Sequence, residues 1–296
     1  MPEETLTLLT ILAHPDDESF GMGGTLALYA RRGVKVHLVC ATRGEAGGVD
    51  AKYLEGFSSI AERRESELRC AAGILGLSEV HFLDYRDSGM PGSPDNVHAQ
   101  ALAAAPLEQV AAKVAHLMRA LRPQVVLTFD SVGGYKHPDH IAVHKATVKA
   151  FSLAADASFR ADLPPHQPQK LYFHIFPKRW LKFAVTVLPI LGKDPRRFGK
   201  NQDIDLMDIV QSGDFPVHAR INYHSVLKEK DAAAACHLSQ LDGASLRQGP
   251  LRWMQWLLAR HDLYMRAFPP PVKGKIENDL FAGVSRSSSV CISGEQ

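Results

Sequence analysis

Short apolar runs alternate with amphipathic segments through the first half of the chain. The apolar runs cover residues 6–13, 34–41, 80–83 and 125–129. Their length and near-continuous apolar character predict strands buried on both faces. The segments between them have apolar residues at helical spacing, which predicts helices over 19–32, 58–75 and 107–121. The first half therefore reads as a regular alternation of strands and helices.

This alternation predicts the fold class. Buried strands that alternate with helices indicate a parallel sheet with helices on both faces. We therefore expect an α/β, Rossmann-like fold with a mostly parallel sheet and a less regular C-terminal portion. Sites in such sheets form beyond the carboxyl ends of the strands.

The second half has a weaker pattern. Residues 170–176 and 217–222 are strand-like, and 225–241 and 252–260 have helical patterns. An apolar stretch over 180–191 is too short to span a bilayer. Core packing and an exposed flap or subunit contact are the alternatives for this stretch, with membrane association a lesser one.

The domain prediction follows from these patterns. We expect one α/β domain over 1–268, with a catalytic core over 1–155 and a C-terminal cap or substrate region over 156–268. The segment 269–296 begins with a proline run and ends in serines, so we expect a poorly ordered tail.

Composition narrows the class of partner. A hydrophobic content of 45% and a charged content of 22% are ordinary for a globular protein. The formal net charge of +2 gives no broad field for nucleic acid or an anionic membrane, so we expect neither as a partner. A small-molecule substrate is the expectation, and self-association stays open.

The cysteines and the start of the chain suggest a compartment. The four cysteines form no CxxC pair, so we expect neither a disulfide framework nor a structural zinc ribbon. Cys40 lies in a predicted strand and is expected to be a buried free thiol. Residues 1–4 are acidic and lead directly into a strand without a signal-peptide pattern, which predicts a cytoplasmic protein.

A first charged cluster follows the first predicted strand. The sequence Ala-His-Pro-Asp-Asp-Glu over 13–18 supplies His14, Asp16, Asp17 and Glu18. So much charge at a strand end is costly unless a cation or a reaction uses it. Two adjacent aspartates point in different directions, so one can bind a metal while the other acts as a base.

A second cluster follows the strand over 125–129. Pro138 suits the first position of a helix, which places His137 at the helix entrance. His137, His140 and His144 then share one helix face. A single histidine is more often a core or capping residue, but three beside a second acidic cluster favour a metal site. About three nitrogen and oxygen ligands with an open position suit zinc-dependent hydrolysis.

Together these motifs resemble a known family. Ala-His-Pro-Asp-Asp-Glu followed by His-Pro-Asp-His over 137–140 is similar to the zinc-dependent N-acetylglucosaminyl deacetylases, also called LmbE-like or PIG-L-like proteins. That family includes enzymes acting on N-acetylglucosaminyl-phosphatidylinositol and deacetylases of mycothiol and bacillithiol biosynthesis. The resemblance covers roughly residues 5–150 and weakens toward His237. The loop over 86–90 is most similar to the mycothiol branch.

The resemblance implies a role for each matching residue. His14, Asp17 and His140 would bind one Zn²⁺ or another divalent transition metal. Asp16 would be the general base. His137 would be the protonated partner that stabilises the oxyanion or protonates the leaving amine, and Asp139 would orient His137. Tyr135 would polarise the substrate carbonyl. Arg64 and Asp87 match sugar-binding positions. The implied reaction is hydrolysis of the acetamide of an N-acetylglucosamine conjugate, and its aglycone stays open.

Two other functions compete with deacetylation. An amidase of the same family acting on a thiol conjugate would differ only in the shape of its pocket. A non-catalytic metal-binding or assembly protein could use 180–191 as a contact surface, but Asp16 and His137 would then have no use.

Three further residues have two possible roles each. Glu18 supports the site or neutralises the helix entrance. His144 supports the site or fills the core, and His237 lies at the pocket rim or on a helix surface.

Overall fold

The computed structural model describes residues 5–159, 162–176, 178–192, 194–197, 205–212, 214–241 and 260–286. Within them a seven-stranded sheet has the order β3-β2-β1-β4-β5-β7-β6. The strands are β1 (Thr7–Leu12), β2 (Lys35–Cys40), β3 (Glu79–Phe82), β4 (Val125–Phe129), β5 (Lys170–Ile175), β6 (Ala219–Asn222) and β7 (His261–Phe268). The helices are α1 (Asp17–Phe20), α2 (Gly23–Arg31), α3 (Ile60–Leu75), α4 (Leu107–Leu121), α5 (Gly133–Lys136), α6 (Pro138–Ala155), α7 (Lys178–Val187), α8 (Leu206–Gln211) and α9 (Leu227–Cys236).

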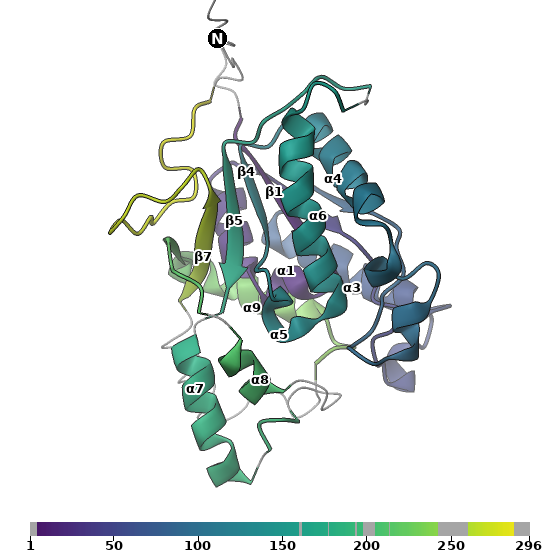
Figure 1. Cartoon of the computed structure of the whole chain (residues 1–296). Coiled ribbons are helices and arrows are strands. Elements are labelled where there is room, and N and C mark those ends of the chain that lie inside the picture. The colour runs from purple at the N-terminus through teal and green to yellow at the C-terminus, as the bar shows by residue number, and fades with distance from the viewer. Residues whose placement is uncertain are drawn as a thin grey trace, which may run out of the picture.

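The sheet confirms the α/β, mostly parallel prediction. Strands β3, β2, β1, β4 and β5 are parallel, and only β7 is antiparallel to its neighbours β5 and β6. Helices α4 and α6 lie together in front of the sheet in Figure 1. The segment after 155 contributes β5, β6 and β7 to this same sheet. The alternating strand β7 was missed, and the helix predicted over 252–260 lies outside the described residues except at Arg260.

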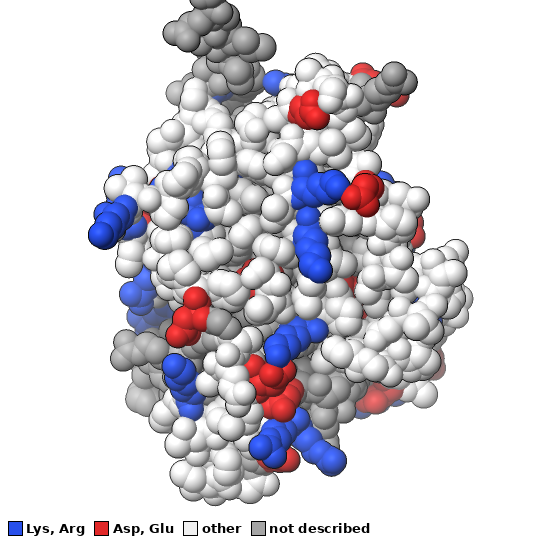
Figure 2. Space-filling view, in the orientation of Figure 1, with Lys and Arg blue, Asp and Glu red and all other residues white. Residues whose placement is uncertain are grey.

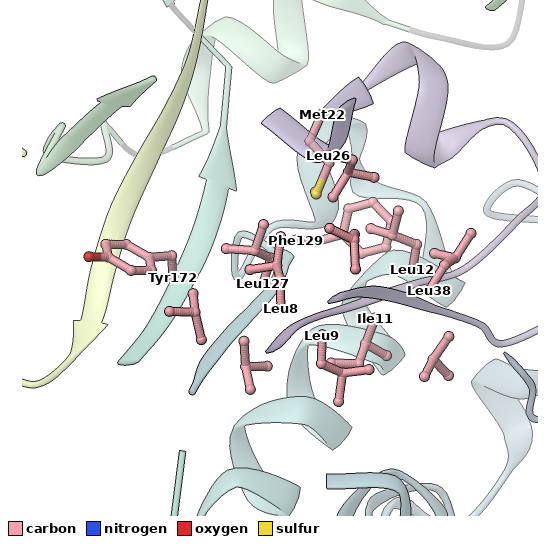
Figure 3. Close-up of a cluster of buried hydrophobic side chains, with 14 of the residues drawn as sticks. Leu8, Leu9, Ile11, Leu12, Met22, Leu26, Leu38, Leu127, Phe129 and Tyr172 are labelled. Carbon is pink, nitrogen blue, oxygen red and sulfur yellow. The ribbon is translucent and has the colours of Figure 1, made fainter. Parts of the chain in front are cut away.

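The core forms on both faces of β1. Figure 3 shows Met22 and Leu26 on one side of this strand and Leu9 and Ile11 on the other. Leu9, Ile11 and Leu26 are fully buried, and Met22 is 1% exposed. Burying a large apolar side chain stabilises the fold by about 1.5–3 kcal/mol, so this core holds the strand ends in place.

Helix α3 agrees closely with the pattern that predicted it. The hydroxyl of Ser59 caps its first turn by accepting a hydrogen bond from the backbone N–H of Glu62. Gly76 ends it in the left-handed conformation, with a φ of 73°. By contrast, the single helix predicted over 19–32 is divided into α1 and α2, because the chain bends at Gly21 and Met22 enters the core.

The cysteines correct the expectation of no disulfide. Cys70 of α3 and Cys236 of α9 are disulfide-bonded, with their Cα atoms 5.9 Å apart. They are 166 residues apart in the sequence, so no local motif marks the pair. Cys40 is a buried free thiol, as predicted.

Part of the segment predicted to be a tail packs against the rest of the domain. Leu280 is fully buried and Phe281 is 8% exposed. The backbone N–H of Leu280 donates to the hydroxyl of Tyr29, 2.6 Å away, which ties this part of the tail to α2. Residues 287–296 lie outside the described residues.

The apolar stretch over 180–191 forms most of α7 and a following turn. Helices α7 and α8 pack together below the sheet in Figure 1, near α5. Phe183 is 47% exposed and Ile190 is 80% exposed, which favours the exposed-flap alternative at these two positions. Among the described residues, no helix combines the length and apolar character needed to cross a bilayer. Figure 2 shows positive and negative side chains interspersed on this face of the molecule.

Candidate active site

The carboxyl ends of β1 and β4 bring the two sequence clusters together. These strands are parallel neighbours, with Leu8 opposite Val125. His14 follows the end of β1, and His137 caps the N-terminus of α6 just beyond β4. The rings of His14 and His137 are 4.5 Å apart between centroids, so residues more than 120 positions apart share one site.

Three side chains offer ligand atoms in a compact triangle. The Nδ1 of His14 lies 3.3 Å from the Nε2 of His140. Asp17 places its Oδ1 3.3 Å from the same His140 nitrogen and its Oδ2 3.6 Å from the Nδ1 of His14. Ligands 2.0–2.1 Å from a tetrahedral zinc ion are about 3.3–3.4 Å apart. Asp17 approaches His140 through Oδ1 and His14 through Oδ2, so the three predicted ligands lie close enough together to hold a divalent metal ion.

Two other ligand sets also include His14. One comprises His14, His137 and His140, and the other His14, Asp87 and Asp139. In the second set, Asp139 accepts hydrogen bonds from the hydroxyl and the backbone N–H of Ser88. Its Oδ2 also lies 3.0 Å from the Nε2 of His14. A carboxylate on the far nitrogen of a ligating histidine is a common support of a metal site, which leaves the Nδ1 of His14 as the nitrogen that could face an ion.

This arrangement gives Asp139 a different contact from the expected one. The resemblance implies that Asp139 orients His137, but its carboxylate lies on His14 instead. The backbone N–H of Asp139 donates to the Nδ1 of His137 at 3.2 Å, which fixes that ring as the N-cap of α6. Asp139 therefore contacts both histidines, one through its side chain and one through its backbone.

Asp16 has an unusual backbone conformation. Its φ is 130°, a value that costs a residue with a side chain about 1–3 kcal/mol. The Nη2 of Arg64 donates to Asp16 Oδ2 at 3.0 Å, and the Oε2 of Glu18 accepts from the backbone N–H of Asp16 at 3.0 Å. Burial raises the pKa of Asp16 to about 6, although the charge of Arg64 opposes that shift. These contacts hold a carboxylate of raised basicity beside the ligand triangle.

Arg64 is buried behind Asp16. It is 4% exposed, and its two Nη groups donate to the carbonyl oxygens of Pro15 and Gly44 as well as to Asp16. Gly44 has a φ of +71°, and a Cβ there would lie 2.1 Å from the guanidinium. Glycine at position 44 is therefore required by the packing of Arg64. These contacts make Arg64 a support of Asp16 and do not test its predicted sugar contact.

Glu18 and His237 extend this support from the other side. The Nε2 of His237 lies 2.7 Å from the Oε1 of Glu18, and both side chains are fully buried. Burial lowers the pKa of His237, but the adjacent Glu18 more than offsets that effect and raises it overall. Glu18 therefore supports the site, and His237 belongs to the interior and not to a helix surface. Only its place in the family pattern pointed to His237 from sequence.

His137 is enclosed by other rings. It is 6% exposed, and burial together with the charges of His14 and His140 lowers its pKa to about 2. That shift favours the neutral form and works against the protonated His137 that the resemblance implies. The ring of Tyr135 contacts His137 and His140, with centroids 5.9 and 4.9 Å away.

The loop that carries Tyr135 depends on glycine. Gly133 and Gly134 both have a φ of +66°, and a Cβ on Gly133 would lie 2.9 Å from the Cβ of His140. Asp130 accepts hydrogen bonds from the backbone N–H groups of Val132 and Gly134 and closes the turn. This turn carries Tyr135 to the edge of the ligand triangle.

The loop after β3 brings Asp87 and Ser88 to the site. Asp87 is 3% exposed, and its Oδ1 lies 3.4 Å from the Nε2 of His14. Burial would raise the pKa of Asp87, but His14 and the backbone N–H of Gly89 bring it below its ordinary value. Ser88 was missed, although its loop follows a strand end. His144 instead faces the core, where its Nδ1 lies 2.9 Å from the carbonyl oxygen of Phe129.

Comparison with known proteins agrees with this site. Residues 9–151 match the family described as PIG-L: GlcNAc-PI de-N-acetylase. A 1D-myo-inositol 2-acetamido-2-deoxy-alpha-D-glucopyranoside deacetylase from Acidothermus cellulolyticus is 35% identical, over 94% of this chain and 95% of its own. One of the same name from Kineococcus radiotolerans is 37% identical, over 95% and 84%.

A solved structure shares the fold at low sequence identity. It is an N,N'-diacetylchitobiose deacetylase from Pyrococcus horikoshii, with a TM-score of 0.61 and 19% identity, over 88% of this chain and 83% of that one. The likeness to this structure concerns the fold alone. The two relatives match nearly the whole chain at more than one third identity. The chain belongs to the PIG-L family of N-acetylglucosaminyl deacetylases.

Proposed function

We propose that the protein is a metal-dependent N-deacetylase that hydrolyses the acetamide of an N-acetylglucosamine conjugate, and that this conjugate is the 1D-myo-inositol glycoside. The observation that carries the reaction is the position of Asp16, a partly buried carboxylate of raised pKa that directly precedes Asp17, one of three potential metal ligands. The inositol aglycone is inferred from the near full-length relatives that are named for this substrate.

We infer that one zinc ion binds to His14 Nδ1, Asp17 and His140 Nε2. Asp17 Oδ2 accepts from the backbone N–H of His14 at 2.8 Å, which leaves Oδ1 directed toward His140. When bound, the ion would supply positive charge to polarise a water molecule and the acetamide carbonyl. The carboxylates of Asp17, Asp87 and Asp139 around the buried His14 make a cation electrostatically suitable here.

The side chains then divide the proton transfers. Asp16 accepts a proton as the water oxygen forms its bond to the acetyl carbon. The bond between that carbon and the amide nitrogen breaks, and the products are acetate and a free amine. Because Nδ1 of His137 accepts from the backbone N–H of Asp139, the neutral ring carries its hydrogen on Nε2 and would donate a hydrogen bond to the developing oxyanion. Asp16 would then deliver the proton that it took from water to the leaving nitrogen. Tyr135 would donate a hydrogen bond to the carbonyl oxygen.

The sugar contacts and the cellular setting are also proposals. Asp87 would accept a hydrogen bond from a sugar hydroxyl. Arg64 would bind the sugar only through N–H groups that do not already donate to Pro15, Gly44 or Asp16. A cytoplasmic location, self-association, and the division of 1–268 into a core and a cap remain predictions from sequence.

An amine-release assay on a panel of conjugates tests this function. Metal-loaded protein is incubated with N-acetylglucosamine glycosides of inositol, malate and a second N-acetylglucosamine, and with an acylated thiol conjugate of the inositol glycoside. We expect a kcat/KM at least tenfold higher for the N-acetylated inositol glycoside than for the others. Preference for the thiol conjugate would establish the amidase alternative. No amine release from any compound would leave a metal-binding protein without catalytic function.

A further inference from the structure

A second group of metal-ligand side chains lies on the edge of the sheet. His37 of β2 pairs in register with Glu79 of β3, and Val39 pairs with His81. Residues two apart on a strand point to the same face, so His37, Glu79 and His81 converge on one side of this edge. None of the proposed catalytic residues belongs to this group.

Its donor atoms already have the spacing of a coordination shell. The Nδ1 of His37 lies 3.4 Å from the Nε2 of His81. The Oε2 of Glu79 lies 3.5 Å from the His81 nitrogen and 3.9 Å from the His37 nitrogen. Ligands of a tetrahedral zinc ion are about 3.3–3.4 Å apart, so only Glu79 needs to move, by about half an ångström.

The three side chains differ in exposure in a way that suits a surface site. His37 is 11% exposed and His81 17%, whereas Glu79 is 59% exposed. The two rings lie beside one another, with centroids 5.6 Å apart and an interplanar angle of 23°. The exposed Glu79 leaves a path for an ion from solvent and room for water to complete its coordination. Lys35 is exposed on the same face of β2, and it is the nearest positive charge along this strand that would repel a bound cation.

The group is separate from the catalytic centre. His37 is opposite Leu9 of β1, and His14 follows five residues later in the chain. At about 3.3 Å per residue, that is roughly 16 Å along the strand direction. An ion in one place therefore does not share ligands with an ion in the other.

We propose that His37, Glu79 and His81 form a peripheral binding site for a divalent transition-metal ion, such as zinc, nickel or copper. Two imidazoles and one carboxylate are the ligand types that these ions accept. The bound ion would join β2 to the edge strand β3 and stabilise that pairing. This inference does not rest on the proposed deacetylase activity.

Metal counting on tag-free protein tests the site. Wild type, His81→Gln and His140→Ala are dialysed against about 50 µM free Zn²⁺, a concentration well above the dissociation constant of an ordered protein site, and analysed for zinc per chain. We expect each variant to hold one ion fewer than wild type, and the double variant two fewer. The His81→Gln variant should keep wild-type turnover within about twofold, since it leaves the catalytic ligands intact.

The controls separate this site from adventitious binding. His116→Gln removes an exposed histidine of α4 and should leave the zinc count unchanged. Glu79→Gln changes an exposed side chain that the fold does not require, and should weaken the second ion about tenfold or more. A zinc titration at lower concentrations measures the weakening in Glu79→Gln. Equal zinc in wild type and His81→Gln, with unchanged zinc affinity in Glu79→Gln, would overturn the proposal. If wild type held one zinc ion more than His81→Gln but released no amine, the peripheral site would be supported and the deacetylase proposal would fail.

Discussion

Two histidine–carboxylate groups lie on the same sheet, and they differ in what surrounds them. At the carboxyl end of β1, His14 and His140 are 5% and 2% exposed, and a further carboxylate, Asp139, holds the far nitrogen of His14. At the edge, His37 and His81 have comparable ligand spacing, but Glu79 is largely exposed. The spacing of the ligands alone therefore does not distinguish a catalytic centre from a peripheral site.

The difference lies in burial and in the supporting contacts. Asp16 is held by Arg64 from one side and by Glu18 from the other, in a backbone conformation with a φ of 130°. A buried ion pair with one partner removed is strongly destabilised, so such a network requires all its members. Within the described residues, the edge group has no comparable network of supporting contacts, and its loss should change metal content alone.

His140→Ala should have the largest effect. It removes one ligand of the catalytic triangle, and we expect turnover to fall by more than about 10³-fold with loss of one zinc ion per chain. Elemental analysis and amine release measure the two effects on the same sample. His81→Gln is the matched control, because it removes a ligand of the edge group only. Full zinc content in His140→Ala would show that the ligand assignment is wrong.

Asp16→Asn separates catalysis from metal binding. The amide keeps the shape of the side chain but cannot act as a base, so turnover should fall by roughly 10²–10⁴-fold. Zinc content should stay at the wild-type value, because Asp16 is not a member of the ligand triangle. Near-normal turnover would place the base elsewhere, whereas loss of zinc would make Asp16 a ligand.

Asp139→Asn should have a smaller effect. The substitution weakens the contact with His14 Nε2, and losing such a support typically costs about 10–100-fold in metal affinity or activity. Zinc titration of the stripped variant, followed by its activity, measures both quantities. If activity fell while zinc affinity was unchanged, the carboxylate of Asp139 would act on the reaction itself and not on metal binding through His14.

His174 provides the smallest expected effect and extends the comparison to a buried histidine outside both groups. Burial lowers its pKa to about 4 in the folded protein, whereas an unfolded histidine titrates near 6.5. The unfolded chain therefore binds the proton more strongly, and stability falls as the pH drops from 6.5 toward 4. Between pH 6.5 and 5 this group should contribute a loss of about 2 kcal/mol.

Urea unfolding of wild type and His174→Gln at pH 7 and pH 5 measures this contribution. We expect the variant to lose about 2 kcal/mol less than wild type between the two pH values. His116→Gln, which changes an exposed histidine, should keep the wild-type dependence. The same pH dependence in all three proteins would show that His174 is not the source.

The regular part of the fold could be predicted because its signals are local. The apolar runs of β1, β2 and β4 and the capped helix α3 each lie within a short stretch of sequence. The paired motifs could be placed together because parallel strands end at one edge of a sheet. By contrast, the Cys70–Cys236 bond and the burial of Leu280 depend on packing between distant segments.

The candidate active site could also be predicted from the sequence only in part. His14, Asp17 and His140 could be named as ligands through family resemblance, but the contact of Asp139 with His14 depends on the rotation of two side chains. Ser88 and its hydrogen bonds to Asp139 have no sequence signature beyond their loop. Likewise, only the folded structure brings the buried His237 onto Glu18.

The most direct test of the account measures acetate and free amine together, from the N-acetylglucosamine–inositol glycoside. Chelator-treated wild type is assayed before and after addition of one equivalent of Zn²⁺, with Asp16→Asn treated in parallel. We predict equal amounts of acetate and amine from wild type, dependent on the added ion, and a rate at least about 10²-fold lower from the variant. Equal rates from the two proteins, or product formation that does not depend on the ion, would contradict the account.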